Sequence, residues 1–175
     1  AHNGVIDLRN WDPDKEGAVQ LGGEWEFYPN QLLQPSSFQE TRDQDWGNRR
    51  NSSKLGSGTG SSAKIVDVPG RWNQWMPGGQ ATGYGTYHVR VLLPEKLENL
   101  YGIHMQNIRN SSRVWIDGAE VGASGIPSVS AEKGKQGNAP FVGFAAIDGH
   151  ATDIIVHVAN YSYSSGGIIY PLLFG

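Results

Sequence analysis

One short stretch of the sequence has residue types that suit the binding of a sugar. Trp72, Asn73 and Trp75 follow a Pro-Gly turn signal, and Tyr84 follows a glycine-containing segment, so all four fall where strands give way to loops. Proteins bind sugars with aromatic faces that stack on C–H surfaces and with amides that hydrogen-bond hydroxyls. We therefore take these residues as candidate ligand contacts. The alternative, strongest for Trp72, is burial in the hydrophobic core, where large aromatic side chains usually lie.

A second set of candidates surrounds a flexible connection near the end of the sequence. Tyr161, Tyr163 and Tyr170 flank the run Ser-Ser-Gly-Gly, and a loop of this kind can close over a ligand. Arg109 and Asn110, from a different predicted loop, would add a charged group and an amide. The alternatives are that the tyrosines pack along an edge of the fold and that the arginine is only solvated.

An acidic segment begins like a calcium-binding loop. Asp12, Asp14 and Glu16 place oxygen ligands at alternating positions, and glycine occupies the sixth position. The bidentate glutamate of such a loop belongs at the twelfth position, which is Gly23 here. We therefore expect a plain acidic turn and no cofactor, with a structural calcium ion as the alternative.

The sequence has no convincing catalytic set. The five histidines, at positions 2, 88, 104, 150 and 157, lack metal-ligand spacing, and there is no cysteine. The nucleophile elbow, the phosphate-binding loop and the dinucleotide fingerprint are all absent. Glu24 and Glu26 share the face of a predicted strand, but a glycosidase needs two carboxylates about 5 to 9.5 Å apart across a cleft. We predict that the domain is not an enzyme.

The elements that must position these candidates are strands and turns. Asp117-Gly118 lies between two alternating runs and predicts a hairpin, because a type I′ turn needs two residues at positive φ. Residues 31–38 predict a short helical turn that Pro35 limits. A long loop is expected over 127–140. Alternation in period two predicts further strands over 4–8, 23–28, 65–68, 84–94, 101–108, 154–159 and 168–173.

Length and composition restrict the class of protein. A chain of 175 residues suits one core, so we expect one domain over 1–175. The Gly/Ser-rich stretch at 49–64 has almost no apolar side chains and predicts a flexible surface loop. A net charge of −3 argues against nucleic acid as a partner, and no apolar run approaches the roughly 20 residues that span a bilayer. The fold class that follows is an all-β, antiparallel β-sandwich of jelly-roll type.

The order of several motifs carries a resemblance to a known family. The motifs are those at 21–27, at 68–73 with 84–90, and at 114–118 with 158–160. Together they resemble the galactose-binding-like jelly roll at the N-terminus of family 2 glycoside hydrolases. With the start at 4–12 and the end at 160–175, the succession is more similar still to the extracellular sensory domain of bacterial receptors that have seven transmembrane helices and diverse intracellular signalling modules.

This resemblance implies a function as well as a fold. It implies a ligand-sensing domain on the extracytoplasmic face of a bacterial membrane, attached to transmembrane and cytoplasmic signalling modules. The ligand would be a carbohydrate-like small molecule. The alternative is the non-catalytic sandwich domain of a family 2 type glycoside hydrolase.

Overall fold

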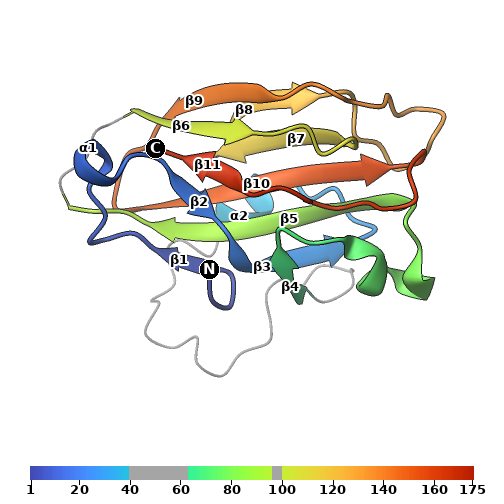
Figure 1. Ribbon diagram of the computed structural model, residues 1–175, viewed down its shortest axis with the longest axis horizontal. Coiled ribbons are helices and arrows are strands. Elements are labelled where there is room, and N and C mark those ends of the chain that lie inside the picture. Colours follow the sequence, from blue (N-terminus) through green and yellow to red (C-terminus); the bar gives the residue numbers. More distant parts are fainter. Residues whose placement is uncertain (40–62, 96–99) are drawn as a thin grey trace.

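Two β-sheets face each other across a core of aromatic and aliphatic side chains in the computed structural model (Figure 1). The structure describes residues 1–39, 63–95 and 100–175, so most of the stretch at 49–64 that we expect to be a flexible loop lies outside the described residues. Among the described residues, no helix has the length and apolarity needed to cross a membrane.

The larger sheet has the strand order β4-β3-β5-β10-β7-β8, and β1 pairs in parallel with β5. Its strands are β1 (Val5–Asp7), β3 (Gly23–Pro29), β4 (Lys64–Val68), β5 (Gly83–Leu92), β7 (Ser111–Ile116), β8 (Ala119–Ser124) and β10 (Ala151–Asn160). The smaller sheet, in the order β2-β11-β6-β9, is antiparallel. Its strands are β2 (Val19–Leu21), β6 (Leu100–Met105), β9 (Phe141–Ala146) and β11 (Leu172–Phe174).

The predicted all-β antiparallel sandwich is confirmed. The hairpin joins β7 to β8, with Asp117 at φ 51° and Gly118 at φ 84°, as a type I′ turn requires. Alternation along β3 buries Trp25 and Phe27 completely. The longest predicted strand is β5, whose Tyr87 lies in the core.

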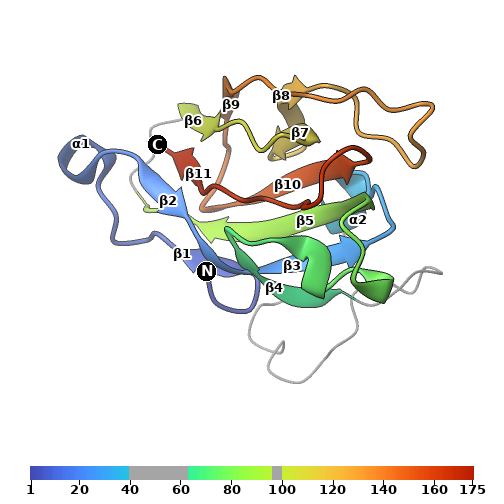
Figure 2. The same ribbon diagram turned by 45° about the vertical axis from the view of Figure 1, so that its right-hand side comes forward.

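Within the described residues, four short helical elements lie in the connections. They are α1 (Pro13–Glu16), α2 (Ser36–Gln39), η2 (Trp72–Gln74) and η3 (Pro77–Gly79). The helical turn predicted within 31–38 corresponds to α2, which follows Pro35. The segment with η2 and η3 lies at the same end of the sandwich as the loop after β10, and Figure 2 shows both coming forward together.

The structure differs from the predicted strands in several places, among them β2, which no predicted strand covers. Residues 168–171 form no strand, because backbone groups of 166–168 pair with the segment after β4 instead of with a sheet, and only β11 remains of the last predicted strand. The sequence pattern also misses β9. Val142 and Phe144 of β9 face outward and are 58% and 63% exposed, so apolar side chains occupy its outer face and no apolar–polar alternation marks it.

Candidate functional site

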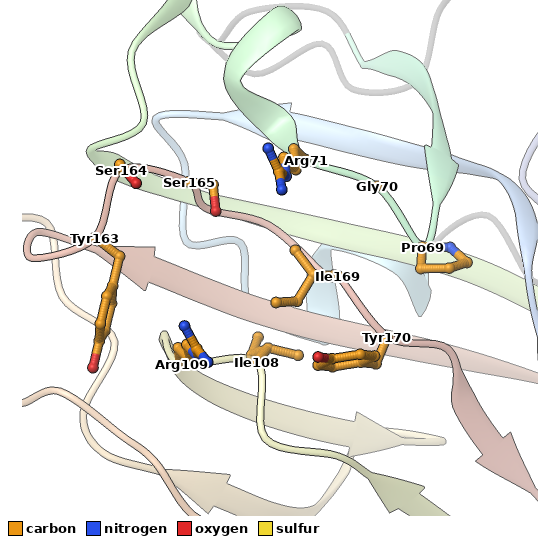
Figure 3. Close-up of a pocket in the computed structure, with 10 residues that line it drawn as sticks. All are labelled: Pro69, Gly70, Arg71, Ile108, Arg109, Tyr163, Ser164, Ser165, Ile169 and Tyr170. Atoms are coloured by element: carbon orange, nitrogen blue, oxygen red, sulfur yellow. The ribbon is translucent and has the colours of Figure 1, made fainter.

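Three connections meet at one end of the sandwich and enclose a pocket of about 410 Å³ (Figure 3). They are the segment after β4, the turn between β6 and β7, and the loop between β10 and β11. These segments lie far apart in the sequence, and the sheet order brings them together. The pocket is lined by Pro69, Gly70, Arg71, Ile108, Arg109, Tyr163, Ser164, Ser165, Ile169 and Tyr170.

Backbone hydrogen bonds join two of the three connections. Gly70 N donates to Ile168 O at 2.7 Å, and Trp72 N donates to Gly166 O at 3.0 Å. The Trp72 side chain is fully buried, and its Nε1 donates to Ala81 O at 2.8 Å. The structure therefore places Trp72 in the core, as in the alternative interpretation of the sequence. Its ring lies inside the protein and is not among the side chains that line the pocket.

Two of the predicted amide contacts also support the loop after β10. Asn73 Nδ2 donates to Ser164 O, and Asn110 Nδ2 donates to Gly167 O, each at 3.2 Å. Asn110 is 1% exposed, so its amide serves the protein's own backbone. These bonds tie the segment after β4 and the turn before β7 to the same loop. The protein's own hydrogen bonds therefore hold the three connections together at the pocket.

Asn160, which the sequence analysis did not single out, fixes the tyrosine that follows it. Its buried Nδ2 donates to Ala81 O at 2.8 Å and to Tyr163 O at 2.9 Å. Its Oδ1 accepts from Tyr163 N at 3.0 Å and from Ser162 N at 3.2 Å. The hydrogen bonds to Asn160 therefore fix both the N–H and the carbonyl of Tyr163, and the residue is 38% exposed at the pocket. Tyr170, across the same loop, is 47% exposed.

The remaining predicted aromatic residues do not line the pocket. Trp75 is partly buried and packs against the main core. Tyr161 Oη donates to Ser128 O at 2.9 Å, which engages the long loop over 127–140. Burial, with a smaller contribution from the neighbouring Tyr84, raises the pKa of the Tyr161 hydroxyl. Tyr84 itself is half-buried on β5. Trp75, Tyr84 and Tyr161 therefore do not contribute to the lining of the pocket.

Arg109 is the predicted charged residue that the structure does bring to the pocket, and Arg71 joins it from the opposite loop. Both are exposed, and neither has an ion pair with another residue in the part of the chain that the structure describes. Arg71 is not among the contacts predicted from the sequence. Its position between a Pro-Gly turn and Trp72, a core anchor, was the available signal.

The acidic segment considered as a calcium loop caps a helix. Asp12 is the N-cap of α1, and its side chain accepts from Asp14 N at 3.2 Å and from Lys15 Nζ at 2.5 Å. Glu16 Oε1 accepts from Asp12 N at 3.2 Å. The Lys15 hydrogen bond lowers the pKa of Asp12. No group of three or more metal-ligating His, Asp or Glu side chains is found within residues 1–39, 63–95 and 100–175.

A second polar cluster lies on the outer face of the larger sheet, beneath α2. His88 Nδ1 is 2.8 Å from Glu26 Oε2, and its Nε2 is 3.0 Å from Asp153 Oδ1. Arg90 Nη1 is 3.5 Å from Asp153, and the ring of Phe38 stacks on His88 at 4.3 Å. Burial alone would lower the pKa of His88, but its hydrogen bonds to the two carboxylates raise it overall. This cluster is covered by Phe38 and lies on a different surface from the pocket.

The sequence matches no protein-family model and no curated protein. Similar folds do occur among solved structures. One is a GH2 β-galacturonidase from Eisenbergiella tayi, with a TM-score of 0.55 and 14% identity over 90% of this chain and 24% of that one. Another is the β-glucuronidase of Ruminococcus gnavus, with a TM-score of 0.60 and 13% identity over 90% of this chain and 28% of that one.

The likeness is to the N-terminal sandwich domain of GH2 glycosidases, a galactose-binding-like fold. At these levels of sequence identity, the likeness shows only that the folds are similar. This chain spans only about a quarter of the length of those enzymes. The part of the resemblance that concerns the sandwich fold is therefore confirmed.

Proposed function

We propose that this chain is the ligand-sensing domain of a bacterial membrane receptor and that its pocket binds a carbohydrate-like small molecule on the extracytoplasmic side. The observation that carries the binding part is the pocket itself, where two exposed tyrosines and two serines of the loop after β10 meet two other connections that hydrogen bonds tie to this loop. The order of motifs along the sequence supports the receptor part.

The chemistry of the lining suits a sugar. Tyr163 and Tyr170 offer aromatic faces to apolar C–H surfaces, and Ser164 and Ser165 offer hydroxyls. The apolar side chain of Ile169 lies between Tyr163 and Tyr170 in the pocket lining. A concave site with mixed apolar and polar groups is the usual form of a small-molecule site.

The domain would bind its ligand without transforming it. The lining residues include no carboxylate and no imidazole, so they offer neither of the usual groups for acid–base catalysis. Glu24 and Glu26, the two carboxylates that share a face of β3, are not among the lining residues. Glu24 is 2.8 Å from His2 Nδ1, and Glu26 belongs to the His88 cluster.

Sensing requires that the ligand shift an equilibrium. A ligand that contacts all three connections favours the arrangement in which they are close together, and it can do so only through unequal affinity for two arrangements. The attached membrane segments and cytoplasmic modules of the parent protein would then read that shift as a signal.

A second candidate is the non-catalytic sandwich domain of a family 2 type glycoside hydrolase, since the same fold occurs in GH2 glycosidase chains. The parent gene discriminates between the two. Seven hydrophobic spans after residue 175 support the receptor, whereas an immunoglobulin-like domain and a barrel support the hydrolase.

Calorimetric titration with a panel of monosaccharides and oligosaccharides tests the binding part. We expect Tyr163→Ala and Tyr170→Ala to weaken the binding of a positive sugar by roughly threefold to tenfold each, since an aromatic contact contributes about 0.5–1.5 kcal/mol. Phe144→Ala is the matched control, because Phe144 is an exposed aromatic residue on β9 that does not line the pocket. A folded domain that gives no heat with any saccharide would refute a sugar ligand.

A further inference from the structure

The charge of the pocket is unbalanced. Arg71 and Arg109 are the only ionisable side chains with a full charge among its lining residues, which include no Asp or Glu. The chain as a whole carries a net charge of −3, so this local excess of positive charge runs against the overall balance. Neither guanidinium has an ion pair within the described residues. Two unpaired arginines at one concave site favour an anion.

The protein holds both arginines in place through their backbones. Arg109 has a φ of 62°, which is uncommon for a residue other than glycine, and Arg109 N donates to Asn107 Oδ1 at 2.7 Å. Its carbonyl accepts a hydrogen bond from Gln136 Nε2. The residues on either side, Ile108 and Asn110, are buried. The turn therefore has one exposed side chain between two anchored ones, and that side chain borders the pocket.

Arg71 is presented in the same way from the other side. It lies between Gly70, whose N donates to Ile168 O, and Trp72, whose ring is fully buried and whose N donates to Gly166 O. Figure 3 shows Arg71 on one side of the loop after β10 and Arg109 on the other, with Ile169 between them. The two guanidinium groups therefore belong to two separate connections that line the same pocket.

We propose that the ligand is an acidic saccharide whose anionic group is bound by Arg71 and Arg109 while the sugar ring lies against Tyr163 and Tyr170. This inference rests on the proposed function and specifies its ligand class. The planar guanidinium forms paired hydrogen bonds with an oxyanion, and a uronate carboxylate or a sugar phosphate supplies one. The tyrosines would account for recognition of the ring, and the arginines for recognition of its charge.

Matched titrations test this proposal with the 1–175 chain. The ligands are galacturonate and galactose, glucuronate and glucose, and glucose 6-phosphate, so that each acidic sugar has a neutral counterpart. We expect at least one acidic sugar to bind roughly tenfold or more tightly than its counterpart, and its binding to weaken as salt is raised. Which acidic sugar binds identifies the carboxylate or the phosphate as the recognised group.

Variants assign the effect to the two arginines. Arg71→Gln and Arg109→Gln should each weaken the binding of the acidic sugar by roughly tenfold and weaken that of its neutral counterpart much less, because hydrogen bonds to a charged group are the stronger ones. Arg109→Lys should restore part of the affinity, since lysine keeps the charge without the paired geometry. Arg9→Gln is the control, because Arg9 is exposed, pairs with Asp7 and does not line the pocket.

The outcomes separate this inference from the proposed function. Equal binding of acidic and neutral sugars, with no effect of the arginine variants, would overturn the acidic ligand and leave a sugar-binding pocket. Binding of neither kind by a folded domain would overturn both. Both arginines are exposed, so circular dichroism of the variants should match that of the wild type.

Discussion

At the scale of single residues, His88 shows how this sandwich accommodates charge on the outer face of its larger sheet. The ring lies between Glu26 and Asp153, with Arg90 beside Asp153 and Phe38 stacked on the imidazole. A protonated His88, together with the guanidinium of Arg90, would balance the negative charges of the two carboxylates. Although burial opposes the charge, the two hydrogen bonds outweigh it and raise the pKa of His88.

We therefore predict that His88 stabilises the fold most at acidic pH. Because its pKa is raised on folding, the stabilisation is fully present below about 6.5, the unfolded value, and is lost as pH rises through the folded value. Urea unfolding of the wild type and of His88→Gln from pH 5.5 to 8.5 checks this. The difference in unfolding free energy between the two should shrink as pH rises.

A control separates this effect from other histidines. His157, whose Nε2 donates to Leu33 O at 2.7 Å, has a pKa lowered by burial and contributes in the opposite direction, but it is common to both proteins. His150→Gln, which changes an exposed histidine outside the cluster, is the control variant. A constant difference between wild type and His88→Gln across the range would contradict the charged cluster.

At the scale of elements, the pocket depends on the close contact between the loop after β10 and the segment after β4. A Cβ added at Gly166 would lie 2.2 Å from Trp72 Nε1, and one added at Gly167 would lie 2.9 Å from Gly70 O. Gly167 also has a φ of 104°. Glycines are therefore needed here because the two backbones approach each other over a buried tryptophan.

Gly166→Ala should consequently destabilise the domain and disturb the pocket together. Overpacking of a close contact typically costs about 1–3 kcal/mol, and here the neighbour is a fully buried ring with little room to move. Urea unfolding measures the loss of stability. Calorimetric titration with a sugar that the wild type binds measures the effect on the pocket. Ser165→Ala, which adds no atom to the same loop, should cost much less stability. Equal unfolding free energies for Gly166→Ala and wild type would contradict the close packing.

The strands could be predicted largely from the sequence, whereas the site could be predicted only in part. Period-two alternation and a two-residue turn are local signals, so β3, β5 and the Asp117-Gly118 hairpin follow from short stretches. The sequence predicted Arg109, Tyr163 and Tyr170 as ligand contacts, and the structure places all three in the lining of one pocket. Arg71 was missed because its role depends on which loops meet, and that is set by strand order across two sheets.

At the scale of the whole molecule, the pocket links three connections that the sheets hold near one another. The segment after β4 extends from the larger sheet, while the loop between β10 and β11 and the turn between β6 and β7 each join the two sheets. A ligand that contacts all three therefore stabilises the arrangement of both sheets, and not a single loop. This property makes ligand binding measurable as global stability.

We predict that an acidic sugar raises the melting temperature of the domain. A ligand at 100 times its Kd stabilises the folded state by about 2.7 kcal/mol, and about 2–4 °C per kcal/mol is typical of a chain of this size. The expected rise is therefore roughly 5–10 °C, measured by differential scanning calorimetry. The matched neutral sugar at the same concentration should give a smaller rise, because it binds more weakly. The Arg71→Gln/Arg109→Gln double variant should show only that smaller rise, and an equal rise in wild type and double variant would mean that the sugar stabilises the fold from another site.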